Sequence, residues 1–154
     1  MRIQVHSRDT VQHIDPALPY AVISVTDPLR GWANVARNSH CQGVLQLHFH
    51  DADRNNVYAP AHLSADEAAQ PTEFIYMDET VARQMIDFVL GLKDKIDLLV
   101  CQCDAGIARS AGIAGAFGKI LLGDDMFIFT NSRYKPNMLV YRTILETYYT
   151  EYYE

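Results

Sequence analysis

The sequence predicts an α/β domain with a mostly parallel central sheet flanked by helices. Residues 20–25 and 98–101 are short apolar runs, as in strands buried within a sheet. Residues 78–92 and 109–122 carry apolar or small residues at helical spacing. Strands that alternate with helices along a chain are typical of this fold class. Because domains most often contain about 100–150 residues, we expect residues 1–154 to form a single domain.

The first half of the chain is expected to supply two strands. Residues 20–25 end at the turn signal Thr26-Asp27-Pro28, and residues 44–50 alternate between apolar and polar side chains. Asp51 and Asp53 come directly after this second strand. Because ligands of parallel sheets bind at the carboxyl ends of the strands, both aspartates are candidates for a functional site.

A polar segment separates these strands from the first long helix. Residues 53–71 predict a loop, in which Ser64 and Glu67 form a capping-box pattern for one short helix. Asp78 is the expected N-cap of the helix that follows.

The second half of the chain is expected to hold a strand and two helices. The strand at 98–101 leads through a short loop into the helix at 109–122. The glycines at 112, 115 and 118 are expected to let that helix approach the sheet closely. A last helix is expected to start near Asn137.

Composition and charge exclude several classes of protein. The chain has 49% hydrophobic and 21% charged residues, which is ordinary globular usage. Its formal charge of −6 argues against a nucleic acid or an anionic membrane as the main partner. No apolar run is long enough to span a bilayer, and three cysteines suggest no disulfide framework. We therefore expect a cytoplasmic protein with reduced thiols.

One stretch carries the strongest chemical signal, and we call it the signature loop: Cys103-Asp104-Ala105-Gly106-Ile107-Ala108-Arg109-Ser110. Backbone N–H groups of a tight loop and of a helix N-terminus bind anions, and Gly106 permits the sharp turn. Arg109 offers a planar fork for two phosphate oxygens. The sequence therefore predicts a phosphate-binding loop, formed by residues 104–109, between a central strand and a helix.

The same loop favours a nucleophilic cysteine. Helix N-termini and neighbouring cations stabilise the thiolate form, so we expect Cys103 to be a thiolate aimed at a bound phosphorus atom. Ser110 is placed to donate a hydrogen bond to the sulfur and to assist its later departure.

The Cys-x5-Arg-Ser pattern resembles the signature loop of the cysteine-dependent protein tyrosine phosphatases. The order of parts, over roughly residues 20–150, resembles the compact dual-specificity branch. The resemblance implies a cofactor-free and metal-free hydrolase of phosphate monoesters that forms a cysteinyl-phosphate. The expected partner is a phosphorylated protein, most simply through phosphotyrosine and also through phosphoserine or phosphothreonine, or a small phosphate monoester. Asp51, or else Asp53, is the implied general acid and base.

Two alternatives stay open at this point. Gln102 stands where this family usually has histidine, which leaves room for a phosphopeptide-binding module with weak or no catalysis. A metal-dependent hydrolase that uses His48, His50 and Asp51 is the other alternative.

Overall fold

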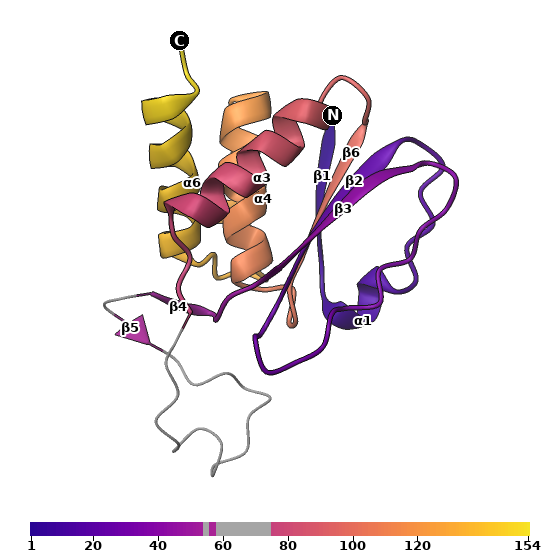
Figure 1. Cartoon of the computed structure of the whole chain (residues 1–154), viewed down its shortest axis with the longest axis horizontal. Helices are drawn as coiled ribbons and strands as arrows, with labels where there is room; N and C mark the ends of the chain where they lie inside the picture. Colours follow the sequence, from indigo (N-terminus) through magenta and orange to yellow (C-terminus); the bar gives the residue numbers. More distant parts are fainter. Residues whose placement is uncertain (54–55, 58–74) are drawn as a thin grey trace.

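A four-stranded parallel sheet forms the centre of the molecule (Figure 1). The computed structural model describes residues 1–53, 56–57 and 75–154. The strands of the sheet lie in the order β1–β6–β2–β3. Their bounds are Arg2–His6 for β1, Leu98–Gln102 for β6, Tyr20–Thr26 for β2 and Cys41–His48 for β3. Every residue of β2 and β6 is buried, as expected for the two inner strands of a sheet covered on both faces.

Three long helices cover one face of the sheet (Figure 1). They are α3 (Glu79–Leu92), α4 (Arg109–Leu122) and α6 (Met138–Glu151). Asp78 caps α3 and Asn137 caps α6, each by accepting a hydrogen bond from a backbone N–H three residues further on. The buried side chains between these helices and the sheet form the larger of two apolar cores.

The opposite face of the sheet is covered by loops and one short helix. Helix α1 (Arg8–Val11) and the segments around it contribute Val11, Ala33 and Val35 to a second, smaller apolar core. The remaining elements are α5 (Met126–Phe129) and a small antiparallel pair of strands, β4 (Ala52–Asp53) and β5 (Asn56–Val57).

The structure confirms the predicted fold class and most of the long elements. The helix expected at 109–122 has those bounds, and the strand expected at 44–50 is shorter at its end, since β3 stops at His48. The neighbouring strand β2 ends at the pair Thr26–His48, so β3 has no strand to pair with beyond His48. The short helix predicted from Ser64 and Glu67 lies outside the described residues.

The expectation for the glycines of α4 is wrong. A Cβ on Gly112 would lie 2.7 Å from the carbonyl oxygen of Asn137, and one on Gly118 would lie 2.6 Å from that of Asp124. These glycines therefore allow close approach of the segments that carry α5 and α6, not of the sheet. No helix in the described parts of the chain is long and apolar enough to cross a membrane.

Candidate functional site

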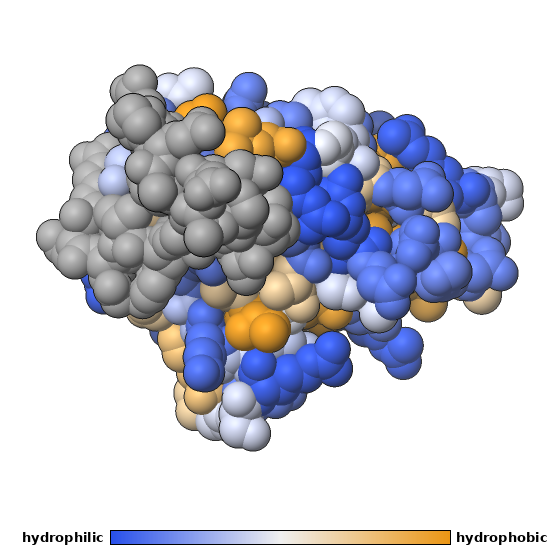
Figure 2. All heavy atoms as spheres, turned by 90° about the horizontal axis from the view of Figure 1, so that it is seen from below, coloured by the Kyte–Doolittle hydropathy of each residue, from blue (hydrophilic) through white to orange (hydrophobic). Residues whose placement is uncertain are grey.

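The signature loop lies at the carboxyl end of β6, between that strand and α4. Figure 2 views this end of the molecule, where hydrophilic side chains gather near the middle of the face. Because β6 pairs with β1 on one side and β2 on the other, residues that follow all three strands meet at the loop.

The loop has a sharp left-handed turn at Gly106, where φ is +70°. A Cβ at this position would lie 2.7 Å from the backbone nitrogen of Ser7, so the turn requires glycine for both conformation and space. Backbone N–H groups of two neighbouring segments donate hydrogen bonds to carbonyl oxygens of the loop. Arg8 N–H donates to the Asp104 carbonyl at 3.1 Å, and Lys135 N–H donates to the Ile107 carbonyl at 3.0 Å.

The backbone N–H groups of residues 104–108 make no hydrogen bond within the described part of the chain. Helix α4, which begins next to them, has no side-chain cap. Free amides on a tight loop that leads into a helix N-terminus form a site for a phosphate-like anion.

Cys103 and Ser110 face each other across this loop. The distance from Cys103 Sγ to Ser110 Oγ is 3.0 Å, and both residues are buried. The hydroxyl is therefore within hydrogen-bond distance of the sulfur. Gln102, the residue before the cysteine, instead accepts a hydrogen bond from Ser24 Oγ of β2.

Arg109 is turned into the site and is almost fully buried. Its Nη1 donates to Asp27 Oδ1 at 2.9 Å and to the Phe49 carbonyl at 2.9 Å. Its Nε is buried and has no hydrogen-bond partner, while Nη2 has only a 3.5 Å contact with Asp104. One nitrogen thus anchors the guanidinium, and the other two remain for an anion.

Asp104 is the centre of an ionic network at the rim of the loop. Arg8 contacts its carboxylate at 3.0 Å and Arg30 at 3.5 Å, and the backbone N–H of Asp27 donates to it at 3.0 Å. Burial alone would raise the pKa of Asp104, but hydrogen bonds with Asp27 and Arg8 and the charge of Arg109 bring this pKa below its ordinary value. Asp104 is therefore an ionised carboxylate beside the Arg109 guanidinium.

Asp27 belongs to the site although the sequence did not single it out. Asp27 directly follows β2, and Asp51 follows β3 after a short connection. Both aspartates lie at the carboxyl ends of strands, so the position that singled out Asp51 in the sequence also applied to Asp27. Burial raises the pKa of Asp27 to about 6; the charge of Arg109 opposes this rise, and Asp104 adds to it. The Asp27–Arg109 ion pair is therefore sensitive to pH in the mildly acidic range.

Asp51 is connected to the signature loop through Asn137. Asn137 Nδ2 donates to Asp51 Oδ1 at 3.0 Å, and Asn137 N–H donates to the Ala108 carbonyl at 2.9 Å. Asp51 is half-buried, so its carboxyl is held beside the loop and still reaches solvent. Asp53 lies in β4, and its side chain is outside the described part of the structure.

His48 and His50 are engaged in separate contacts. The His48 ring stacks on Trp32 with ring centroids 3.6 Å apart, whereas His50 Nδ1 accepts a hydrogen bond from Ile75 N–H at 3.0 Å. Within the described ranges, no group of three histidine, cysteine or acidic residues is arranged to hold a metal ion.

Comparison with known proteins agrees with this geometry at the level of the fold. No protein-family model and no curated protein sequence matches the chain. The structure is similar to Tk-PTP in its active form, with a TM-score of 0.53, 11% identity and coverage of 95% of this chain and 92% of that chain. It is similar to PTPMT1, with a TM-score of 0.51, 11% identity and coverage of 97% and 90%. A human tyrosine phosphatase-like serine/threonine/tyrosine-interacting protein gives a TM-score of 0.50, 19% identity and coverage of 88% and 80%.

The chain therefore has the fold of the tyrosine phosphatases. Its single α/β domain, with four parallel strands and flanking helices, is the arrangement that it shares with these structures.

Proposed function

We propose that the protein hydrolyses phosphate monoesters, with phosphotyrosine in proteins as the first candidate substrate, through a cysteinyl-phosphate on Cys103. The observation that carries the proposal is the arrangement around Arg109. The guanidinium is anchored by Asp27 through one nitrogen, and its Nε is buried without a partner beside a loop of free amides. A buried donor without a partner is costly, and a bound phosphoryl group would satisfy it.

In the proposed first step, the Cys103 thiolate attacks phosphorus and the bond to the leaving oxygen breaks. Arg109 and the amides of residues 104–108 stabilise the charge on the equatorial oxygens. Asp51 protonates the leaving oxygen and so becomes a carboxylate. Asp53 is the second candidate for this proton transfer.

In the second step, the same carboxylate accepts a proton from water, which attacks the phosphorus of the cysteinyl-phosphate. The S–P bond breaks, and the sulfur leaves as a thiolate that Ser110 Oγ stabilises from 3.0 Å. Phosphate is released, and no metal or redox cofactor is required.

The first experiment compares Cys103→Ser with the unchanged protein. We expect the variant to lose turnover of an aryl phosphate and to retain binding of tungstate, because the loop amides and Arg109 are unaltered. Cys41→Ser is the matched control, since Cys41 is a half-buried cysteine of β3. Undiminished turnover by Cys103→Ser would disprove the mechanism.

A binding module without turnover is the second candidate, and one observation favours it. Gln102, directly before Cys103, carries no charge, and its amide oxygen accepts a hydrogen bond from Ser24 Oγ. Tight tungstate binding combined with no measurable turnover of aryl phosphates would support this candidate. Loss of activity with a chelator would instead support the metal-dependent alternative that uses His48, His50 and Asp51.

A further inference from the structure

The outer edge of β1 is open, and its backbone is available for pairing. Arg2 N–H donates to the Asp97 carbonyl, and the His6 carbonyl accepts from Cys103 N–H. The backbone groups of Arg2 and His6 therefore point toward β6. Because backbone groups alternate along a strand, those of Ile3 and Val5 face away from the sheet. They have no hydrogen-bond partner within the described part of the chain. This edge can therefore accept another strand.

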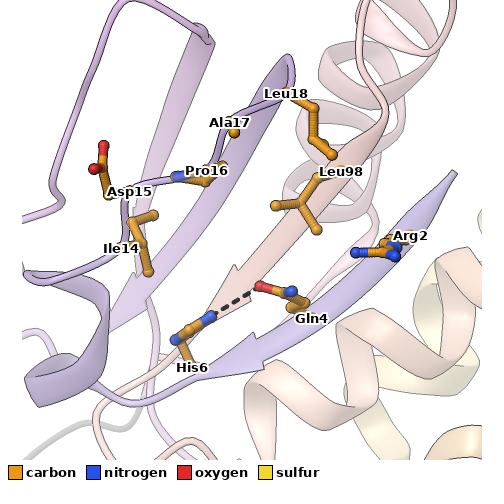
Figure 3. Close-up of a pocket in the computed structure, with 9 residues that line it drawn as sticks. All are labelled: Arg2, Gln4, His6, Ile14, Asp15, Pro16, Ala17, Leu18 and Leu98. Carbon is orange, nitrogen blue, oxygen red and sulfur yellow. Dashed lines mark hydrogen bonds between the residues drawn. The ribbon is translucent and has the colours of Figure 1, made fainter.

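Two cavities lie on either side of this edge. The first, of about 420 Å³, lies between β1 and residues 14–18 on the loop-covered face of the sheet (Figure 3). Arg2, Gln4 and His6 point into it, and Leu98 of β6 also lines it. Its acidic residue, Asp15, accepts a hydrogen bond from Asn38 at 2.8 Å.

The second cavity, of about 470 Å³, is on the helix-covered side, and polar residues (Gln4, His6 and Asn131) line it together with apolar ones. Ile3 and Val5 of β1 and Phe127, Ile128 and Tyr134 from the region of α5 line it. Met126, next to these residues in α5, is 56% exposed. Large exposed apolar side chains beside a groove are typical of interaction sites.

Arg2 and Arg133 give this edge two cations, although the chain as a whole carries −6, and Asp15 is the one acidic residue that lines the first cavity. Arg2 and Arg133 are exposed and form no ion pair with any described residue. Arg133 lies near His6, and burial together with the Arg133 charge lowers the pKa of His6. Arg2 and Arg133 are therefore the cations that a ligand at this edge would meet.

We propose that the β1 edge binds an extended segment of another protein in which apolar and acidic side chains alternate. The added strand pairs with the backbone of Ile3 and Val5. Its apolar side chains enter the cavity beside α5, and its carboxylates face Arg2 on the other side. A second copy of this chain fits less well, because its β1 would bring Arg2, Gln4 and His6 to that side and no carboxylate. This proposal does not depend on the proposed phosphatase activity.

The test uses two fluorescein-labelled peptides, one alternating valine and glutamate and the other alternating valine and lysine. Fluorescence anisotropy should show binding of the glutamate peptide only. Arg2→Glu should weaken that binding by about fivefold, as expected for one cross-strand charge pair, and should improve binding of the lysine peptide. Arg142→Glu, at an exposed position of α6, is the matched control and should change neither. Equal binding of both peptides, or of neither, overturns the proposal.

A second measurement locates the peptide independently of charge. Amide hydrogen exchange at Ile3 and Val5 should slow when the glutamate peptide binds, since these N–H groups then donate to it. Val5→Pro should abolish binding while circular dichroism confirms that the variant folds. If Val5→Pro does not fold, the amide exchange rates of Ile3 and Val5 in the unchanged protein still test the proposal. Exchange at Ile3 and Val5 that is unaltered by the peptide overturns the proposal, as does a concentration-dependent dimer in which these amides become protected.

Discussion

At the scale of single residues, the anchoring of Arg109 by Asp27 gives the site a pH dependence. The carboxylate of Asp27 is ionised above its pKa of about 6, and then holds Nη1 of Arg109 through a charge-assisted hydrogen bond. As the pH falls through this value, Asp27 takes up a proton and the bond loses its charge. Arg109 is then held less firmly for an incoming phosphate.

We predict that Asp27→Asn lowers kcat/KM for an aryl phosphate at pH 7 by about ten- to a hundredfold, the value of a hydrogen bond to a charged group. The pH profile of the variant should also lack the decline near pH 6 that we expect of the unchanged protein. Asp27→Glu should restore part of the activity, and Asp94→Asn, at an exposed position after α3, should have no effect. Superimposable profiles of Asp27→Asn and the unchanged protein would exclude the anchoring role.

Ser110 gives a second prediction at this scale. In the proposed mechanism the Ser110 hydroxyl stabilises the departing thiolate, so Ser110→Ala should slow breakdown of the cysteinyl-phosphate more than its formation. Rapid-mixing kinetics should then show a burst of leaving group followed by a slow steady state. A variant that loses both phases equally would argue against this role.

At the scale of elements, the turn of the signature loop depends on its contact with the end of β1. We predict that Gly106→Ala destabilises the protein by about 2–5 kcal/mol, from backbone strain and overpacking together, and weakens tungstate binding. Gly123→Ala is a sharp control, because Gly123 has a similar φ of +68° but no atom within 4 Å of a Cβ. Urea denaturation of both variants should show the larger loss for Gly106→Ala.

Asn137 joins three elements, and its two functions can be separated. Its Oδ1 caps α6, while its Nδ2 donates to Asp51 and to the Ala52 carbonyl. Asn137→Ala should cost about 1 kcal/mol through loss of the cap and should also slow hydrolysis of substrates with poor leaving groups. Asn137→Ser should keep the cap but show the same loss of rate. If both variants hydrolyse poor leaving groups at the normal rate, Asn137 does not orient the general acid.

The sequence was sufficient where the signal is local. The run from Cys103 to Ser110 contains the proposed nucleophile, the turn residue and the arginine in one stretch, so the loop and the helix after it were predictable. Asp27 carried the same strand-end signal as Asp51, but its pairing with Arg109 was not predictable, because Arg109 is 82 residues away and the two meet only through the pairing of β2 with β6. The strand β1 was missed although Arg2–His6 alternates between polar and apolar residues, which is the signal of a half-buried edge strand.

At the scale of the whole molecule, occupation of the site should stabilise the fold. A ligand that binds only the folded state at a hundredfold excess over its Kd adds about 2.7 kcal/mol of stability. For a domain of this size, each kcal/mol raises Tm by about 2–4 °C, so tungstate should raise it by about 5–11 °C. Arg109→Lys should remove most of this shift, and Arg142→Lys should retain it. An equal shift in both variants would place the tungstate elsewhere.

The most direct measurement is mass spectrometry of the protein quenched with acid during turnover of an aryl phosphate. Ser110→Ala is used for this measurement, because its intermediate should accumulate. We expect one phosphoryl group on the peptide that contains Cys103, and none on that peptide in Cys103→Ser. Steady turnover with the Cys103 peptide unmodified, or with the phosphoryl group on another side chain, would contradict the proposed mechanism.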